Sequence, residues 1–399
     1  GLTGETLSDT GIRLSWNAVS DTSPTGGYYI EYDTRNDFPS PDVIGPTADL
    51  TVETYDVSGL LPFTTYYFRI KSEISGYYSP FSEVISQGTA SPPPAPAAYD
   101  ISELAGDWFF HNLFSGDDPQ WTGWEYGEIE IQADGDVSIS GWSSEEETFT
   151  GTTTISVTED GLVMTSDGDN LHGVVSTDRS LIVATSDDSD GGYSMKVLTR
   201  QDPGATYADS DMAGTWRIHE LISGDDPQSP GWLHGTMSVE ASGNYTVTDM
   251  IESGTALPDY SSRFSISSGG VVSEVGNPTF HGVLNGDKNL AVFTDDTDGY
   301  LLGFAVKRAP AANFNQQDLI GTWYVHRLVS GDAALGNEPG WSYSTIISDP
   351  TGGIDYYEVD SNGYAGSGSG LSTLSIDADG VVTDTDKPSL RGVMSGDEA

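Results

Sequence analysis

The chain has 399 residues and carries 61 Asp and Glu against 15 Lys and Arg, which gives a formal net charge of −46. This charge excludes nucleic acid and anionic lipid as partners, because their phosphates would be repelled rather than neutralised. The absence of cysteine excludes a disulfide scaffold, a thiolate zinc site and a cysteine nucleophile. Within these bounds, the abundant Gly, Ser, Thr and Asp favour many short strands joined by tight turns.

Residues 1–89 alternate between apolar and polar side chains, which is typical of half-buried strands. Two clear cases are residues 12–16 (IRLSW) and 66–71 (YYFRIK). Residues 60–66 (LLPFTTY) resemble the L-x-P-x-T-x-Y signature of fibronectin type III domains, and Trp16 resembles the core tryptophan of their second strand. The resemblance implies a β-sandwich that acts as a spacer or binding module. The Arg-Gly-Asp loop of some family members is absent, so integrin-type adhesion is not implied.

Residues 90–101 are predicted to be a linker. They contain the proline-rich run 91–98 (SPPPAPAA), and consecutive prolines favour an extended, semi-rigid backbone.

Three copies of a second module are predicted to follow, at residues 102–200, 209–308 and 318–399. Each copy opens with Gly-x-Trp, and the tryptophans Trp108, Trp216 and Trp323 recur at a period of 108 and then 107 residues. Such a period is too long for a solenoid coil and suits a complete domain. Late in each copy a Gly-Val pair follows a basic or imidazole side chain. The residue before the Gly-Val pair is His172 in the first copy, His281 in the second and Arg391 in the third.

Eight short strands are predicted in the second copy. They cover residues 215–221, 235–240, 245–250, 263–267, 271–275, 281–284, 289–294 and 301–307. A meander of this kind favours an antiparallel barrel, because closure removes exposed sheet edges. A pair of propeller blades and a flattened sandwich remain alternatives. The predicted fold class is all-β: a sandwich followed by three tandem barrel-like modules, the last of them incomplete.

A second resemblance is carried by Gly-x-Trp on the first strand together with a basic residue at the end of the last strand, Arg200 or Arg308. This pairing resembles the lipocalin and calycin barrels. The resemblance implies that the cation packs over the tryptophan and closes the bottom of the barrel.

The third copy stops at Ala399, before the equivalents of residues 289–294 and 301–307. Two interpretations stay open. Either the natural chain continues, or another chain donates the missing strands, as in strand-complemented polymers.

Two sets of residues are candidates for ion or ligand binding. Acidic turns offer oxygen ligands for calcium, which would be the cofactor. The preference of turns for Asp and Gly also explains these residues without any ion. Tryptophans near the Ser-Gly-Asp loops could stack on sugar rings, with packing as the alternative. The acidic residues are Asp187, Asp188, Asp190, Asp295, Asp296 and Asp298, and the aromatic residues are Trp121, Trp124, Trp232 and Trp341. A metal site made of recurring histidines is disfavoured, because Arg391 replaces one of them.

No catalytic constellation stands out, so the chain is predicted not to be an enzyme. We expect a secreted, structural surface protein that forms rigid units of a bacterial fibre, sheath or adhesin. It would associate with itself, by strand complementation of the third copy, or with other extracellular proteins, and its leader would be absent from this sequence. The alternative is an array that binds glycans or small ligands, as an accessory to an enzyme. No apolar run is long enough to insert into a membrane.

Overall fold

The computed structural model divides into two compact units, Gly1–Ala97 and Ala98–Ala399. The residues that it describes are 1–7, 11–19, 26–36, 38–39, 41–47, 49–60, 65–89, 98–115, 122–165, 171–187, 192–223, 231–297, 299–308, 314–329, 339–348, 353–362, 365–384 and 391–394.

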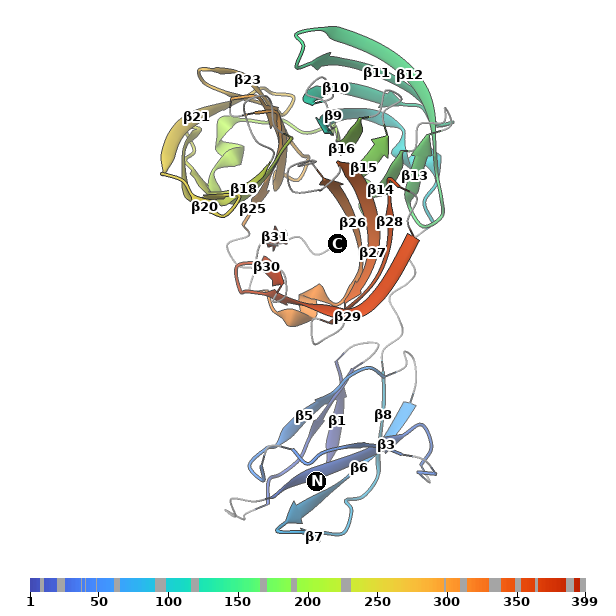
Figure 1. Ribbon diagram of the computed structural model, residues 1–399. Coiled ribbons are helices and arrows are strands. Elements are labelled where there is room, and N and C mark those ends of the chain that lie inside the picture. Colours follow the sequence, from blue (N-terminus) through green and yellow to red (C-terminus); the bar gives the residue numbers. More distant parts are fainter. Residues whose placement is uncertain are drawn as a thin grey trace. The chain divides into compact units, whose positions relative to one another are not determined.

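The first unit is a sandwich of two antiparallel sheets (Figure 1). The three strands of one sheet are β1 (Thr3–Thr6), β2 (Ile12–Ser15) and β5 (Thr54–Val57). The five strands of the other are β3 (Gly26–Asp33), β4 (Asp42–Ile44), β6 (Thr65–Ile74), β7 (Tyr77–Tyr78) and β8 (Ile85–Gly88). The sandwich predicted from the alternating pattern is therefore confirmed.

The core of this sandwich lies between the inward faces of the two sheets, where Ile12 and Phe68 are fully buried. Trp16 packs edge-on against Tyr28, with ring centroids 5.2 Å apart. The Tyr28 hydroxyl donates to the Leu50 carbonyl at 3.1 Å and accepts the Val19 amide at 2.8 Å. Tyr66 of the predicted signature is buried in the same core, while residues 61–64 of that signature lie outside the described residues.

The second unit begins with a closed eight-stranded barrel, here called the first barrel. A short 3-10 helix, η1 (Ile101–Leu104), precedes it. The last strand pairs with the first, Arg200 opposite Trp108, so the ring has no free edge. Its strands are β9 (Gly106–Ser115), β10 (Gly123–Ile131), β11 (Asp136–Ser143), β12 (Thr148–Val157), β13 (Leu162–Thr165), β14 (His172–Val175), β15 (Leu181–Asp187) and β16 (Tyr193–Arg200).

The middle barrel follows, after η3 (Asp209–Met212), and is also closed, because β18 pairs with both β17 and β19. Each of the eight predicted strands has a counterpart, and the barrel replaces the propeller and sandwich alternatives. A two-residue strand, β20 (Thr255–Ala256), was not predicted. The other strands are β17 (Gly214–Ile222), β18 (Gly231–Val239), β19 (Asn244–Glu252), β21 (Tyr260–Ile266), β22 (Val271–Glu274), β23 (Asn277–Leu284), β24 (Leu290–Asp295) and β25 (Leu301–Lys307).

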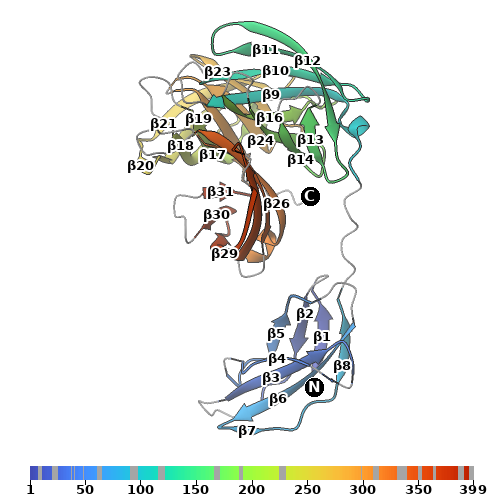
Figure 2. The same ribbon diagram turned by 45° about the vertical axis from the view of Figure 1, so that its right-hand side comes forward.

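The third module is a curved six-stranded sheet that follows η4 (Gln316–Leu319) (Figure 2). Within the described part of the module, β26 pairs only with β27, and β31 only with β30. The strands are β26 (Gly321–Val329), β27 (Gly340–Ser348), β28 (Gly353–Asp360), β29 (Ala365–Ile376), β30 (Val381–Asp384) and β31 (Arg391–Val393). They correspond to β9–β14 of the first barrel. Trp323 is consequently 36% exposed, whereas Trp108 and Trp216 are 0% exposed.

The 3-10 helices close one end of each barrel. The indole Nε1 of Trp108 donates to the Leu104 carbonyl of η1 at 2.9 Å, and Trp216 donates to Met212 of η3 at 2.7 Å. Arg200 lies over the Trp108 ring at 5.6 Å and donates to the carbonyls of η1 and its C-cap, as predicted.

The equivalent cation of the middle barrel is Lys307, and the prediction that it is Arg308 was wrong. Lys307 lies 5.3 Å from the Trp216 ring and donates to the Asp211 carbonyl at 2.7 Å. The strand register decides this, because Lys307 lies opposite Trp216 and the next residue along the strand faces the other way. Arg308 instead pairs with Asp379 of the third module.

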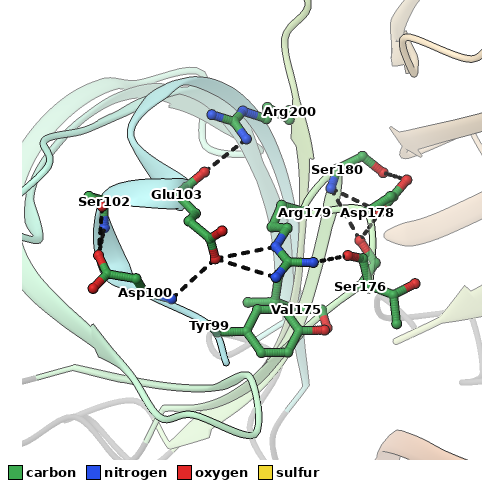
Figure 3. Close-up of polar contacts among 11 residues, drawn as sticks. Tyr99, Asp100, Ser102, Glu103, Val175, Ser176, Asp178, Arg179, Ser180 and Arg200 are labelled. Atoms are coloured by element: carbon green, nitrogen blue, oxygen red, sulfur yellow. Dashed lines mark hydrogen bonds and ion pairs between the residues drawn. The ribbon is translucent and has the colours of Figure 1, made fainter. Parts of the chain in front are cut away.

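A second basic residue, Arg179, makes contacts at the same end of the first barrel (Figure 3). The Arg179 guanidinium lies 4.5 Å from the Tyr99 ring centroid and 3.3 Å from the Glu103 carboxylate. In the middle barrel, Lys288 takes this position, over Tyr207 and 3.0 Å from Asp211. The closed ends are therefore built in the same way from non-identical residues.

Candidate ligand cavity in the middle barrel

The middle barrel encloses a cavity of about 880 Å³. Period-two alternation turns one face of every strand inward, so β17 contributes Ile218, Glu220 and Ile222. Apolar side chains line the end nearest η3. They include Met212, Met237 and Phe264.

Small inward side chains account for part of this space. Ala291 of β24 takes the position that the bulkier Ile182 fills in the first barrel, and both residues are buried. Ile218 likewise stands where the first barrel has Phe110. Smaller side chains on a backbone of the same design leave unfilled volume.

The opposite end of the cavity is acidic. Four carboxylates line it, from Glu220, Glu252, Glu274 and Asp295, and none of the described lining residues is Lys or Arg. The Asn277 amide bridges two of them, donating to Glu274 at 3.1 Å and to Asp295 at 2.9 Å. Protein donors therefore hold these carboxylates in place at the mouth.

Two tyrosine hydroxyls complete the polar end. Tyr245 donates to the Glu274 carboxylate. Burial raises the pKa of Tyr245, and the neighbouring Tyr260 and Glu274 raise it further. Burial also raises the pKa of Tyr260, with additional contributions from the charges of Glu220 and Glu274. Both hydroxyls therefore stay protonated and act as hydrogen-bond donors.

The predicted calcium ligands are separated by the strand register. Asp295 faces the cavity and accepts the Thr279 hydroxyl at 2.7 Å, whereas Asp187 accepts the Trp341 indole at 2.5 Å in a contact between modules. Because Thr185 and Thr294 hold equivalent positions opposite His172 and His281, the equivalent of Asp187 is Asp296 and not Asp295.

Among the described residues, no group of three or more His, Asp or Glu side chains could hold a metal ion. Asp188, Asp190 and Asp298 lie outside the described residues. Calcium binding at these turns stays a prediction.

The predicted glycan-stacking tryptophans are mostly covered. Trp124 is 3% exposed and Trp341 is 4% exposed, and each packs against a histidine of another module. Neither ring is therefore the exposed platform that stacking on a sugar requires. Trp232 is only partly buried, and Trp121 lies outside the described residues.

The cavity residues were not among the predicted site residues, although the sequence of the first strand contains one indication of them. The first strand of the middle barrel reads Trp216, Ile218, Glu220 and Ile222 on its inward face. A carboxylate on an otherwise apolar face indicates a polar contact inside the barrel.

The comparisons with known proteins cover parts of the chain. The fibronectin type III family model matches residues 1–88. Residues 1–88 are a fibronectin type III domain. This domain occupies the sandwich of the first unit, as the sequence predicted.

A relative of the chain is chitinase Chi52 of Paenibacillus xylanexedens, which is 32% identical over 121 residues. The match covers 29% of this chain and 20% of the chitinase, so the chain spans a fifth of that protein's length. Beyond the fibronectin type III domain, no family is shown for the remaining modules.

Similar solved structures include a de novo designed fluorescence-activating β-barrel, at 22% identity and a TM-score of 0.20 over 26% of this chain and 99% of that one. A DUF3598-family protein of Nostoc punctiforme matches at 12% identity and a TM-score of 0.20, over 67% of this chain and 96% of that one. With scores this low, the fold rests on the strand pairing described above. No helix in the described residues is long and apolar enough to cross a membrane.

Proposed function

We propose that this chain is a non-enzymatic extracellular protein whose middle barrel binds a small molecule with an apolar body and a hydrogen-bond-donating or cationic head. The observation that carries the proposal is the cavity of about 880 Å³ inside a closed barrel. Its volume lies within the range of about 300–1,000 Å³ that ligand pockets occupy.

The lining selects the chemistry of the ligand. The apolar end around Met237 and Phe264 would bury a hydrocarbon or ring system, and each buried methylene contributes about 0.8 kcal/mol. The mouth is rich in carboxylate oxygens, including those of Glu220 and Glu252, so it favours an ammonium or hydroxyl head that donates hydrogen bonds. A carboxylate head would be repelled.

The protonation and hydrogen bonding of the polar groups support a binding role rather than a catalytic one. The mouth tyrosines have raised pKa values, which keeps them from acting as bases near neutral pH. Asp295 accepts bonds from Asn277, Thr279 and Thr297 and is thereby held in one orientation. The fibronectin type III domain fits a spacer in the same chain, and the partial likeness to a chitinase favours an extracellular setting as an accessory region.

Ligand binding can be tested by calorimetry with three probes of equal length: dodecylammonium, dodecanol and dodecanoate. We expect the first two to bind at least ten times more tightly than dodecanoate. Ala291→Ile, which introduces the larger residue of the first barrel, should weaken all three by at least tenfold. Glu220→Gln should reduce only the preference for dodecylammonium.

The control is Thr246→Ile, which places the same new side chain at an exposed position of β19. It should leave binding unchanged. The proposal is wrong if none of the three probes binds to the unmodified protein, or if Ala291→Ile binds them as well as Thr246→Ile does.

A structural role as a repeating unit of a fibre, sheath or adhesin is a second candidate. The supporting observation is that β26 and β31 each pair on one side only within the described part of the third module. Such edges accept a strand from another chain. Light scattering across a hundredfold concentration range tests this role, because a strictly constant monomer mass contradicts strand exchange.

A further inference from the structure

A groove of about 420 Å³ lies between the first and middle barrels. Strands β9–β12 of the first barrel supply most of the residues that line it, and β22 and β23 of the middle barrel supply the rest. Neighbouring residues of β23 line different spaces, because Phe280 lines the cavity inside the middle barrel and His281 lines the groove. The groove is therefore a second site, separated from that cavity by the wall of the middle barrel.

The strand register places a row of aromatic side chains along the groove. His111, Tyr126 and Trp142 lie opposite one another on β9, β10 and β11. Directly opposite side chains share one face of a sheet and lie next to each other. This face is the outer face of the first barrel, because the His281 ring of the middle barrel stacks on the Tyr126 ring, with centroids 3.9 Å apart. Tyr126 is thereby held in place, and Trp142 is partly exposed farther along the row.

A second row beside the first is mainly polar. It lies two residues along each strand, so its side chains point to the same face. The row consists of Phe109, Glu128, Ser140 and Thr150, of which the last three are exposed. None of the described residues that line the groove is Lys or Arg. The groove thus combines flat apolar rings with hydroxyl and carboxylate oxygens, and it offers no basic side chain to an anion.

His111 adds a buried hydrogen-bond acceptor to the lining. Its Nε2 lies 3.1 Å from the His281 carbonyl, and because a carbonyl only accepts, Nε2 carries the hydrogen. Burial lowers the pKa of His111 to about 3, so the ring has a single hydrogen at pH 7 and Nδ1 is an acceptor. Nδ1 is buried, and none of the described residues donates a hydrogen bond to it. A buried acceptor without a donor is costly, so we expect the ligand of this groove to carry a donor.

These features together favour a neutral sugar ring. One face of a pyranose consists of C–H groups that pack on aromatic rings, and its edge carries hydroxyls that both donate and accept hydrogen bonds. An anionic ligand is disfavoured by the Glu128 carboxylate and by the lack of a basic side chain among the described lining residues. An alkyl chain would cover the polar row without forming hydrogen bonds to it.

We propose that the groove between the first and middle barrels binds a neutral sugar ring. Trp142 is the stacking platform, and His111, Glu128 and Ser140 are the hydrogen-bond partners. The site does not depend on the proposed ligand of the middle barrel. It also uses none of the four tryptophans that the sequence suggested for stacking on sugars.

Calorimetry with four pentasaccharides tests the proposal. Three probes are neutral and built from glucose, xylose or N-acetylglucosamine, and the fourth is the anionic pentagalacturonate. We expect at least one neutral probe to bind at least ten times more tightly than pentagalacturonate. Trp142→Ala should weaken that binding at least tenfold. Trp232→Ala, which removes an indole outside the groove, is the matched control and should bind like the unmodified protein.

A second pair of variants fills the groove instead of removing its platform. Ser140→Phe adds a ring at an exposed position that lines the groove and should weaken binding of the sugar at least tenfold. Ser138→Phe makes the same change two residues earlier on the same face of β11, at an exposed position outside the groove, and should leave binding unchanged. Ala291→Ile, which fills the cavity of the middle barrel, should also leave sugar binding unchanged. This last variant separates a failure of the groove from a failure of the proposed function.

Nuclear magnetic resonance of nitrogen-15-labelled histidine gives a third measurement. The Nδ1 signal of His111, assigned by its loss in His111→Gln, should move when the sugar binds, while the signals of His219 stay in place. The proposal is overturned if no neutral probe binds, or if Trp142→Ala and Ser140→Phe bind as well as their controls. Loss of binding in Trp232→Ala with full binding in Trp142→Ala would place the sugar elsewhere. An unmoved His111 signal in the sugar complex would also contradict the proposal.

Discussion

At the residue scale, the second unit depends on a few side chains whose polarity is controlled by burial. His111 is buried between the first and middle barrels, and burial lowers its pKa to about 3. Burial likewise lowers the pKa of His326 to about 4 at the next interface. Both rings are therefore neutral at pH 7, when one nitrogen can donate and the other accept.

These shifts predict that acid weakens the folded second unit. An unfolded histidine binds its proton near pH 6.5, whereas native His111 does not bind one until about pH 3, so stability falls as pH drops through this window. The slope is about 1.4 kcal/mol per pH unit for each such histidine. Urea unfolding at pH 7.5, 6.0 and 5.0 should show a smaller loss for His111→Gln than for the unmodified protein. Equal losses in the two proteins would contradict this account, and Ser138→Ala, at an exposed position, serves as the control.

A second prediction concerns the cation that closes the first barrel. Arg200→Ala removes two hydrogen bonds to carbonyls and the contact with Trp108, and should lower the free energy of unfolding by about 2 kcal/mol. Arg200→Lys should cost less, because Lys307 fills the same role in the middle barrel. Denaturant unfolding measures both. Arg263→Ala, which changes a largely exposed arginine, should stay within about 0.5 kcal/mol. A loss in Arg200→Ala no larger than that of Arg263→Ala would show that the closure contributes little.

At the element scale, the first and middle barrels have the same strand order but different side chains in their interiors. The first and middle barrels share the 3-10 helix that closes one end, the tryptophan of the first strand and the basic residue at the end of the last strand. They differ at inward positions such as Ile182 and Ala291, where the middle barrel has the smaller side chain. The sequence predicted the strands and the closure correctly, because both follow from alternation and turn chemistry.

The packing of β24 against β25 supplies a prediction at this scale. A Cβ added at Gly303 would lie 2.2 Å from the Phe293 ring, which must then move toward the cavity. Gly303→Ala should therefore lower the free energy of unfolding by about 1–3 kcal/mol and weaken binding of the dodecyl probes. Thermal unfolding and calorimetry test the two effects separately. Gly254→Ala adds a methyl group where no atom lies within 4 Å and controls for added bulk, although its positive φ adds local strain. Full stability and full binding in Gly303→Ala would mean that Phe293 has room to retreat elsewhere.

At the scale of the whole molecule, the fibronectin type III domain and the second unit have separate cores. Within the second unit the modules are not separate in this way. An apolar cluster built from all three, with Leu113, Leu221 and Leu328, joins them. The domain and the three-module unit are therefore expected to be the two cooperative units of the chain.

Calorimetry should accordingly show two unfolding transitions, one for the fibronectin type III domain and one for the second unit. A fragment of residues 1–97 should unfold at the same temperature as the first of them, because its core is complete within that range. A fragment of residues 98–399 should keep the second. A shift of more than a few degrees in either fragment would reveal energetic coupling between the units.

The sequence by itself determined the fibronectin type III domain, the three-fold repeat and the strand pattern. These features follow from local alternation, turn residues and internal similarity. Only the tertiary structure decided that Lys307 rather than Arg308 covers Trp216, and that Asp295 faces a cavity while Asp187 meets another module. A register shift of one residue moves a side chain to the other face of its strand, and pairing between distant strands sets that register. The cavity and the contacts between the modules depend on the same pairing, because they form only where side chains from several strands or modules converge.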